Sequence, residues 1–195
     1  MTAATSTSAG LGTGKVVIQA AMSLDGFIAG PGHAMDWVFE YTGPDNFPEI
    51  VHATGAMLSG RNCYEVGLRD TGKPSGEAYG GAWHGPSFVL THRPPDGPGT
   101  DDPTFLSGDI GAAVATAKAA AADKDLVVLG ANVAGQCLAR GLVDEVFVFV
   151  LPVLLGSGTP LHEASEASGA GRVDLRPVSS THSGSVTALR FQVVR

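Results

Sequence analysis

Four turns of this sequence hold the residue types that could bind an anion or handle a proton. Each turn follows or ends a short apolar run: Asp25 after 15–22, Gly60-Arg61 after 56–59, Arg93 at the end of 88–93, and Gly130 after 126–129. A glycine turn that leads into a helix exposes backbone N–H groups, which bind phosphate together with a nearby guanidinium. A carboxylate beside them could position a substrate or relay a proton. Such turns indicate a phosphate site, although most α/β proteins contain several and most of them bind nothing.

The stretch 126–155 sets the expected order of the elements. Four apolar residues open it, Gly130 breaks the run, a helix is expected over 133–140, and a second apolar run starts at Val146. Strand, glycine turn, helix and strand in this order predict a βαβ unit of a parallel sheet. The unit places the free N–H groups of a helix start just beyond a strand's carboxyl end.

The rest of the chain supplies the elements of one α/β domain, which we expect to span residues 15–195. Residues 15–22 are β-branched and nearly continuous in apolar character, as in a central strand that is covered on both faces. Residues 110–122 have the spacing of an amphipathic helix, and 173–178 and 188–194 alternate as strands do. Residues 1–14 carry no charged side chain and no apolar core stretch, so we expect a disordered leader.

Composition narrows the class of partner and the compartment. Charged residues make up 16% of the chain and the net charge is −7, which argues against a nucleic-acid partner or an anionic membrane surface. No apolar run reaches the roughly 20 residues that span a bilayer. Cys63 and Cys137 belong to no Cys-x-x-Cys pair or Cys/His cluster, so we expect a reduced, cytoplasmic protein with no structural metal.

Several short sequence motifs occur in the same order as in a known protein family. They are Ser23-Leu24-Asp25-Gly26, Gly60-Arg61-Asn62-Cys63-Tyr64-Glu65, Thr91-His92-Arg93, Gly130-Ala131-Asn132, and Gly141-Leu142-Val143-Asp144-Glu145. The sequence resembles dihydrofolate-reductase-like proteins, in the subfamily related to the C-terminal reductase domain of the bifunctional riboflavin-biosynthesis enzyme. The resemblance implies an α/β, dihydrofolate-reductase-like three-layer fold, in which a mixed central sheet carries helices on both faces. It also implies that the last strands are antiparallel and that the protein is a homodimer.

The same resemblance implies that the cofactor is NADPH and assigns residues to it. The pyrophosphate would lie at Gly130, Ala131, Asn132 and Val133, and further phosphate contacts would come from Gly60, Arg61, Asn62 and Cys63. Thr91, His92 and Arg93 would lie near the ribose 2′-phosphate, where they converge with Arg61. Two positions depart from the family pattern, because Cys63 stands where a threonine is usual and Leu129 where a first glycine is usual. A thiol donates a weaker hydrogen bond than a hydroxyl, so one phosphate contact differs from that of relatives.

Two residues are candidates for the substrate end, and each has two interpretations. Asp25 could line the substrate pocket and position the substrate or relay a proton, or it could be a turn residue that accepts a backbone N–H; the two roles are compatible. Trp37 could stack on a flat heterocycle or close the core beneath a loop. We interpret Asp36, His84 and His162 as solvated or structural side chains.

The function that follows is NADPH-dependent hydride transfer to a small, flat heterocyclic or carbonyl substrate, with Asp25 as the catalytic candidate. One alternative is the 5-amino-6-(5-phosphoribosylamino)uracil reductase of riboflavin biosynthesis. Its substrate needs its own phosphate-binding cations, and the sequence shows no second basic cluster beside Asp25. The other alternative is a nucleotide-binding or regulatory protein that keeps the fold without turnover.

Overall fold

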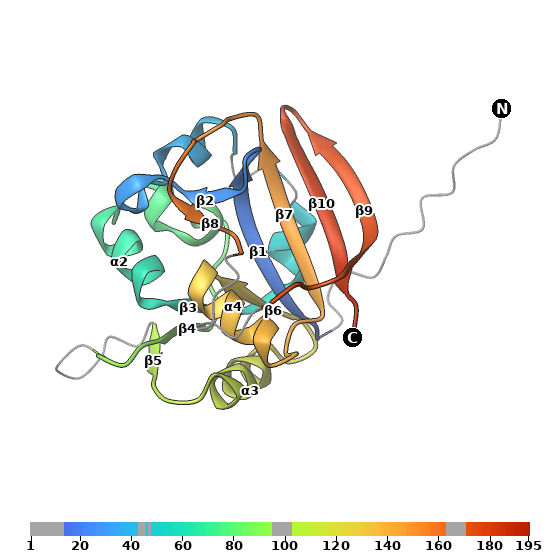
Figure 1. Ribbon diagram of the computed structural model, residues 1–195. Helices are drawn as coiled ribbons and strands as arrows, with labels where there is room; N and C mark the ends of the chain where they lie inside the picture. The colour runs from blue at the N-terminus through green and yellow to red at the C-terminus, as the bar shows by residue number, and fades with distance from the viewer. Residues whose placement is uncertain (1–13, 43–45, 47, 95–102, 163–170) are drawn as a thin grey trace.

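The apolar run that begins at Val16 forms the central strand of the molecule. In the computed structural model, which describes residues 14–42, 46, 48–94, 103–162 and 171–195, β1 (Val16–Ser23) lies between β6 (Asp125–Leu129) and β7 (Glu145–Leu151) (Figure 1). Both pairings are parallel, with Val17 opposite Val127 on one side and Glu145 on the other. The crossover from β6 through α4 (Ala131–Ala139) to β7 therefore straddles β1. This is the predicted βαβ unit.

The main sheet has eight strands in the order β5-β4-β3-β6-β1-β7-β10-β9. The strands not yet given are β3 (Thr54–Gly60), β4 (Ser87–Leu90), β5 (Thr104–Leu106), β9 (Leu175–Ser183) and β10 (Val186–Val193). Six strands are parallel, whereas β10 runs antiparallel to β7 and β9 antiparallel to β10. A small second sheet pairs β2 (Phe27–Ala29) with β8 (Thr159–Pro160). The predicted mixed sheet with antiparallel last strands is confirmed.

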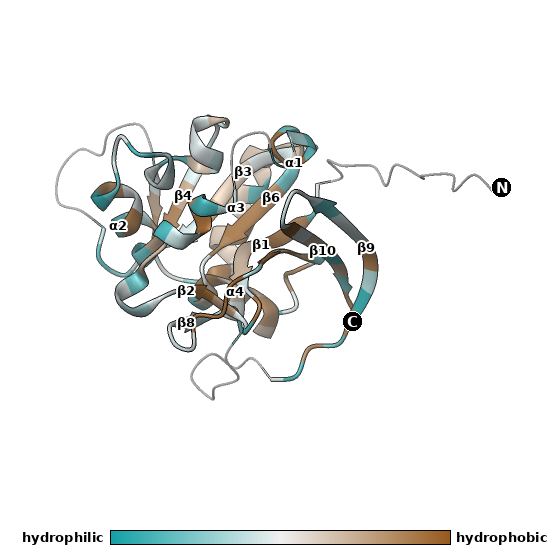
Figure 2. Cartoon of the chain, turned by 90° about the horizontal axis from the view of Figure 1, so that it is seen from above, coloured by the Kyte–Doolittle hydropathy of each residue, from teal (hydrophilic) through white to brown (hydrophobic). Residues whose placement is uncertain are grey.

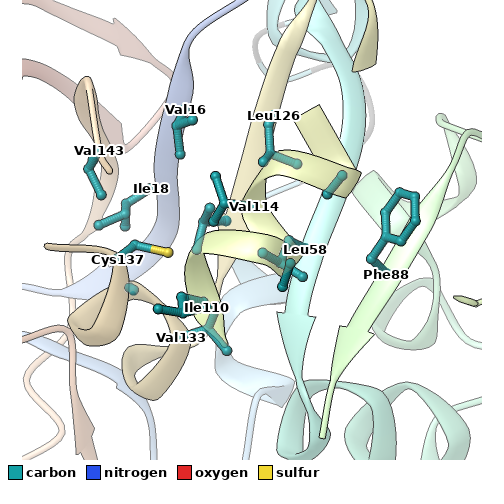
Figure 3. Packing of buried hydrophobic residues seen from close by; sticks show 14 of the residues in the cluster. Val16, Ile18, Leu58, Phe88, Ile110, Val114, Leu126, Val133, Cys137 and Val143 are labelled. Carbon is teal, nitrogen blue, oxygen red and sulfur yellow. The ribbon is translucent and has the colours of Figure 1, made fainter. Parts of the chain in front are cut away.

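One face of the sheet is covered by α3 (Ile110–Ala121) and α4. Ile110, Val114 and Ala117 recur at helical spacing and pack against Leu58 and Leu126 of the sheet (Figure 3). Asp109 caps α3, since its Oδ1 accepts hydrogen bonds from the N–H groups of Gly111 and Ala112 at 2.8 and 3.2 Å. The helix expected over 110–122 is therefore confirmed, and the residue before it caps its N-terminus.

The opposite face carries α1 (Pro48–Ala53), α2 (Arg61–Arg69) and the 3₁₀ segments η1 (Pro31–His33), η2 (Asp36–Glu40), η3 (Pro74–Gly76) and η4 (Ala78–Gly81). Strand residues alternate between faces, so Val17 joins this side while its neighbours Val16 and Ile18 join the other. Leu106 packs on the α3 side, and the ring of the preceding Phe105 meets Tyr64 of α2 edge-on at 5.1 Å. Figure 2 shows the apolar β1 and β6 inside the molecule and β9 at its margin (Figure 2). Helices therefore lie on both faces, as expected.

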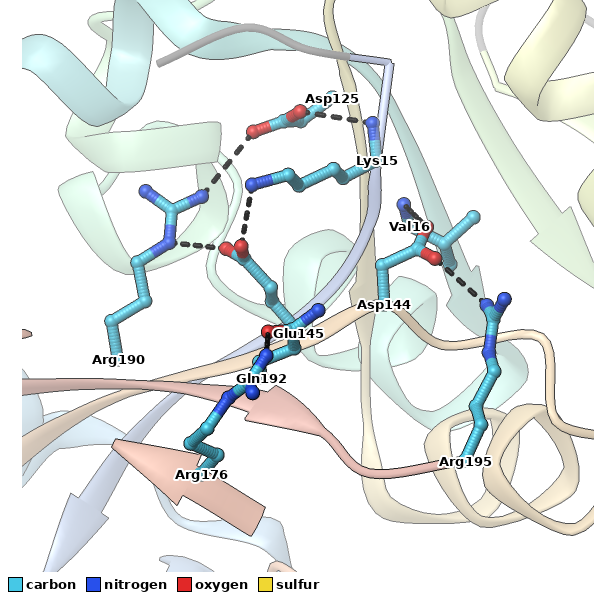
Figure 4. Close-up of polar contacts among 9 residues, drawn as sticks. All are labelled: Lys15, Val16, Asp125, Asp144, Glu145, Arg176, Arg190, Gln192 and Arg195. Carbon is cyan, nitrogen blue, oxygen red and sulfur yellow. Dashed lines mark hydrogen bonds and ion pairs between the residues drawn. The ribbon is translucent and has the colours of Figure 1, made fainter. Parts of the chain in front are cut away.

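A buried ion network closes the edge of the sheet at which the parallel strands begin (Figure 4). Glu145 accepts from Lys15 Nζ at 2.5 Å and also from Arg190 Nε, and Arg190 Nη2 lies 3.7 Å from Asp125 Oδ2. The side chains of Asp125, Glu145 and Arg190 are between 5% and 11% exposed. Charges buried this deeply are tolerated because each faces an opposite charge. The network ties together strands β1, β6, β7 and β10.

Several element boundaries differ from those expected from the pattern. The strand expected over 88–93 ends at Leu90, and the helix expected to begin at 133 begins at Ala131. The strand expected over 173–178 runs from Leu175 to Ser183, because β10 pairs with it along its whole length. Of the predicted leader, residues 1–13 lie outside the described residues. Across the part of the chain that the structure describes, every helix is too short or too polar to cross a membrane.

Candidate functional site

The candidate residues all lie at the edge of the sheet where the parallel strands end. Adjacent strands are about 4.8 Å apart, so the strand order places Arg93 after β4, Arg61 after β3, Gly130 after β6 and Asp25 after β1 in a row. β3 leads through α2 to β4, whereas its neighbour β6 leads through α4 in the opposite direction to β7. Such a switch point between adjacent parallel strands is where ligands bind in open α/β sheets. The four sequence motifs are thus brought to one edge of the sheet.

The starts of α2 and α4 face each other across this switch point. A Cβ added to Gly60 would lie 3.2 Å from Val133 Cγ2, and one added to Gly130 would lie 2.8 Å from Cys63 Sγ. Gly130 also has a φ of +87°, which side-chain-bearing residues rarely adopt. The close approach of the two helix starts therefore depends on the single glycine at 130, although the family's first glycine is replaced by Leu129.

Neither helix start is capped by a side chain. The N-cap residues are Gly60 for α2 and Gly130 for α4, and neither cap makes a side-chain hydrogen bond. The contrast with α3, which Asp109 caps, shows that capping is available to this chain and is not used at the switch point. Two uncapped starts leave backbone N–H groups for an anion, and the positive ends of both helix dipoles favour it. Val133 is buried beneath these turns, whereas Asn132 is exposed beside them.

Arg61 and the residues after β4 are in direct contact. Arg61 Nη1 donates to the Arg93 carbonyl oxygen at 2.6 Å, and Arg61 Nε donates to Glu65 at 2.8 Å. Thr91 is buried, and its Oγ1 accepts from the Arg93 N–H at 3.1 Å. His92 and Arg93 are exposed. Because a surface ion pair such as Arg61–Glu65 contributes little energy, a phosphate could displace it.

Cys63 lies between the two helix starts with its sulfur against Gly130. Burial raises the pKa of its thiol, and hydrogen bonding to the backbone N–H groups of Gly60 and Cys63 opposes that shift. Cys63 therefore stays a neutral thiol. A thiol is a weaker donor than a hydroxyl to any anion held there.

Asp25 joins the turn after β1 to the loop after β7. Its Oδ1 accepts from Ser23 Oγ at 2.6 Å and from the Leu155 N–H at 3.1 Å, and its Oδ2 accepts from the Gly156 N–H at 2.7 Å. The hydrogen bond from Ser23, followed by that from Gly156, lowers the pKa of the Asp25 carboxyl. The turn itself is held by Ser23, whose Oγ accepts from the Phe27 N–H at 3.0 Å. Asp25 thus accepts backbone N–H groups, as one interpretation expected, but from a loop about 130 residues later.

Trp37 packs with Met35 and Val38 on the second core cluster, beside Ala21 and Val153 at the carboxyl ends of β1 and β7. Its Nε1 donates to the Ala34 carbonyl oxygen at 3.2 Å. The indole therefore closes the core beneath its loop, which was one of its two interpretations. Stacking of Trp37 on a substrate stays a prediction.

The structure adds a residue that no sequence motif singles out. His33, in the loop after β2, has Nε2 3.4 Å from Asn62 Nδ2 in the first turn of α2. Its φ is +60°, a conformation that follows from the tight turn of η1 and leaves no mark in the apolar pattern. His162 contacts the Gly171 carbonyl oxygen and His84 is exposed. Among the described residues, no group of three or more His, Cys, Asp or Glu could hold a metal ion.

Comparisons with known proteins agree with this geometry. The family model of the RibD C-terminal domain matches residues 14–189. The uncharacterized protein YwjB of Bacillus subtilis (strain 168) is 29% identical over 153 residues, which is 76% of this chain and 83% of that protein.

Solved structures share the fold. A putative riboflavin biosynthesis protein from Shewanella sp. PV-4 superposes with a TM-score of 0.74 at 24% identity, over 93% of this chain and 99% of that one. The diaminohydroxyphosphoribosylaminopyrimidine deaminase/5-amino-6-(5-phosphoribosylamino)uracil reductase from Thermotoga maritima gives 0.64 at 17% identity, over 92% of this chain and 56% of that longer one. Dihydrofolate reductase from Enterococcus faecalis gives 0.62 at 14% identity, over 94% and 98%. The predicted dihydrofolate-reductase-like fold is confirmed.

Proposed function

The chain belongs to the RibD C-terminal domain family of dihydrofolate-reductase-like oxidoreductases, and we propose that it uses NADPH to reduce a small, flat heterocyclic or carbonyl substrate. The observation that carries this proposal is the pair of uncapped helix starts at Gly60 and Gly130, with Arg61 and Arg93 beside them. A pyrophosphate matches the two helix starts, and the Arg61 guanidinium, together with Arg93 one strand further along, matches a 2′-phosphate.

Each predicted cofactor residue has a part in this arrangement. Gly130, Ala131 and Asn132 would offer backbone N–H groups to the pyrophosphate, with Val133 fixing the helix start from below. Gly60, Asn62 and Cys63 would form the facing wall. Arg61, Thr91, His92 and Arg93 would hold the ribose 2′-phosphate, with Thr91 shaping the turn that presents Arg93. When bound, NADPH supplies the hydride; the protein orients the two reactants and excludes water from them.

Asp25 would act at the substrate end as an ionised carboxylate. Its lowered pKa disfavours a proton relay at neutral pH, since the carboxyl would have to take up a proton well above its own pKa. Its contacts with Leu155 and Gly156 instead fix the distance between the turn after β1 and the loop after β7. We therefore propose that Asp25 positions the substrate by holding these two segments, with Trp37 supporting the adjoining loop.

The proposal is tested by thermal denaturation with NADPH, with NADH and without nucleotide, followed by nicotinamide absorbance during turnover. Selective binding to the folded state raises the melting temperature, so NADPH should stabilise the protein more than NADH does. Decay of absorbance with any compound of a panel of pterins, pyrimidines and small carbonyl compounds completes the assignment. Stabilisation without turnover across the panel would favour the regulatory alternative, and absence of stabilisation by either nucleotide would contradict the proposal.

We also propose that two copies associate through β9. This strand forms one margin of the main sheet, and its residues from Leu175 to His182 are all exposed, including Leu175 and Val178 at 41% and 42%. An exposed edge strand of nine residues presents unpaired backbone groups that readily pair with another strand. Light scattering of the purified protein should give a dimer, and Val178→Lys should shift it towards the monomer.

A further inference from the structure

The positive charges of this chain are unevenly divided between the two edges of the main sheet. All twelve Lys and Arg residues fall within the described residues. Two of them, Arg61 and Arg93, lie at the carboxyl edge of the sheet, next to β3 and β4. The others lie towards the opposite edge, where the parallel strands begin. They lie in the last turn of helices that lead back to strand starts or just after these helices, or they lie in or next to the first half of β9, the second half of β10 or the start of β1. They are Lys15, Arg69, Lys73, Lys118, Lys124, Arg140, Arg172, Arg176, Arg190 and Arg195.

The proposed cofactor accounts for both cations of the carboxyl edge. Arg93 is three strands from β1, which is about 14 Å, and Arg61 is two strands away, about 10 Å. Arg140, at the end of α4, is about 13 Å along that helix from Ala131 and pairs with Asp109. No Lys or Arg therefore remains for an anion bound beside Asp25. The segments outside the described residues contain none either.

The substrate end carries instead a negative charge and apolar side chains. Asp25 receives hydrogen bonds from neutral groups, and none of the chain's Lys or Arg residues, all of which are described, forms an ion pair with it. Leu24 directly precedes Asp25, and Leu154 directly precedes Leu155. Their side chains are 66% and 69% exposed, and the Leu24 N–H donates to the Val153 carbonyl oxygen at 2.9 Å. An anion placed here would meet the Asp25 carboxylate, which repels it, with no counter-charge to offset the repulsion.

We infer that the substrate of this site carries neither a phosphate nor a carboxylate, and is a neutral, flat ring system that rests against Leu24 and Leu154. The inference builds on the proposed function, because it takes the Arg61 end to be occupied by NADPH. The inference excludes two kinds of substrate, phosphoribosyl pyrimidines and dihydrofolate bound through its glutamate tail.

The test compares kcat/KM within two matched pairs at saturating NADPH. One pair is 5-amino-6-(5-phosphoribosylamino)uracil and its dephosphorylated riboside, and the other is dihydrofolate and 6-methyl-7,8-dihydropterin. The charged member should have no advantage in either pair, at about 50 mM or about 200 mM salt. A preference of about tenfold or more for a charged member, falling as salt rises, would overturn the inference, since charge-assisted contacts give gains of that size.

Binding of ribose 5-phosphate to the NADPH-saturated protein gives an answer that does not depend on turnover. Calorimetry should show no saturable binding tighter than about 1 mM, and tighter binding would overturn the inference. Stabilisation by NADPH is measured first on the same sample. Its absence defeats the proposed function and is thereby distinguished from a wrong substrate class.

A charge inserted at Leu154 provides the positive test. Leu154 is mostly exposed, so Leu154→Lys should fold normally, and Leu154→Gln is the matched neutral control. The lysine variant should raise the preference for the phosphorylated over the unphosphorylated pyrimidine by roughly tenfold, the size of a new charge-assisted contact, and bind ribose 5-phosphate where the glutamine variant does not. If neither quantity changes, the substrate does not lie against Leu154 and the inference fails.

Discussion

The two edges of the main sheet, where the same strands begin and end, differ in how their polar groups are partnered. At the starting edge, Lys15, Asp125, Glu145 and Arg190 bury their charges and pair them with one another. The cavity beside this network has a volume of about 20 Å³, room for about one water molecule. At the finishing edge, Gly60 and Gly130 leave helix N–H groups without side-chain partners.

The difference indicates which edge holds the protein together and which one is kept for a ligand. Substitutions at the starting edge should lower stability and leave intrinsic nucleotide affinity unchanged. Substitutions at the finishing edge should lower nucleotide affinity, and they should lower stability only where they also strain the backbone, as at Gly130. The following changes test that division, in order of decreasing effect.

Removal of Arg190 should give the largest loss of stability. Arg190→Met leaves the carboxylates of Glu145 and Asp125 buried without the guanidinium that faces both, and breaking a buried charge pair costs about 3–5 kcal/mol. Urea denaturation measures the change. The matched control Arg195→Met removes an exposed pair with Asp144 and should cost less than about 1 kcal/mol. Equal losses of stability in the two variants would show that the buried network stabilises the protein no more than an exposed ion pair does.

Gly130→Ala should damage both stability and cofactor affinity. The positive φ costs about 1–2 kcal/mol, and the new methyl would press on Cys63 Sγ at 2.8 Å. We expect NADPH to bind at least about tenfold more weakly, equivalent to about 1.4 kcal/mol. Gly141→Ala is the matched control, because Gly141 has a φ of +64° but open space around it. It should show the same strain and unchanged affinity; a loss of NADPH affinity in Gly141→Ala would contradict the assignment.

Arg61→Met should remove discrimination between NADPH and NADH without unfolding the protein. The loss of charge-assisted hydrogen bonds is worth about 1.5–3 kcal/mol, or roughly 10- to 100-fold in NADPH affinity. Lys118→Met makes the same change of charge on an exposed position of α3 and should alter neither affinity. Isothermal titration with both nucleotides measures the ratio. Parallel loss of NADPH and NADH binding would place Arg61 away from the 2′-phosphate.

Cys63→Thr should strengthen NADPH binding by up to about tenfold, because a hydroxyl donates a hydrogen bond worth about 0.5–1.5 kcal/mol. Cys63→Val has nearly the shape of threonine without the hydroxyl and separates packing from hydrogen bonding. Improved binding in the threonine variant alone supports a phosphate at this position. The same improvement in both variants would assign the gain to packing against Gly130.

The smallest effect concerns Asp25 and pH. Hydrogen bonds, that from Ser23 first, hold the folded pKa of Asp25 below its ordinary value of 3.8. A group with a lowered folded pKa stabilises the protein above its unfolded pKa and loses that contribution as pH falls through the folded pKa. The stability difference between the wild type and Asp25→Asn should therefore be constant from about pH 5 to 8 and shrink below about pH 4. Ser23→Ala should move that loss to higher pH, and an unchanged profile would show that Ser23 does not set it.

Local signals in the sequence were enough to predict most strands of the main sheet and the helices α3 and α4, but not the small sheet of β2 and β8. The apolar run after Lys15 predicts a central strand because both of its faces are covered, and Gly130 predicts the turn into α4 because it interrupts an apolar run. The placement of the four phrases at one edge then follows from parallel topology. The family resemblance supplied the mixed sheet and its antiparallel end.

Contacts between distant segments could not be predicted in the same way. Asp25 accepts hydrogen bonds from the N–H groups of Leu155 and Gly156, and no local pattern connects these residues to the turn after β1. The contact of His33 with Asn62 depends on a backbone turn of η1, and the length of β9 depends on its pairing with β10. The pairing of Arg61 with Glu65 follows helical spacing and could have been read from the sequence.

The position of β1 has a consequence for biosynthesis. Lys15, just before this strand, contacts Asp125 and Glu145, which are 110 and 130 residues later in the chain. At about 5–20 residues per second, β1 leaves the ribosome on the order of ten seconds before its neighbours exist. Throughout that interval an apolar strand has no sheet to join and is open to association with other nascent chains. The centre of the main sheet therefore forms only after β6 and β7 have been made, and the yield of active protein should depend on chaperones that shield β1 until then.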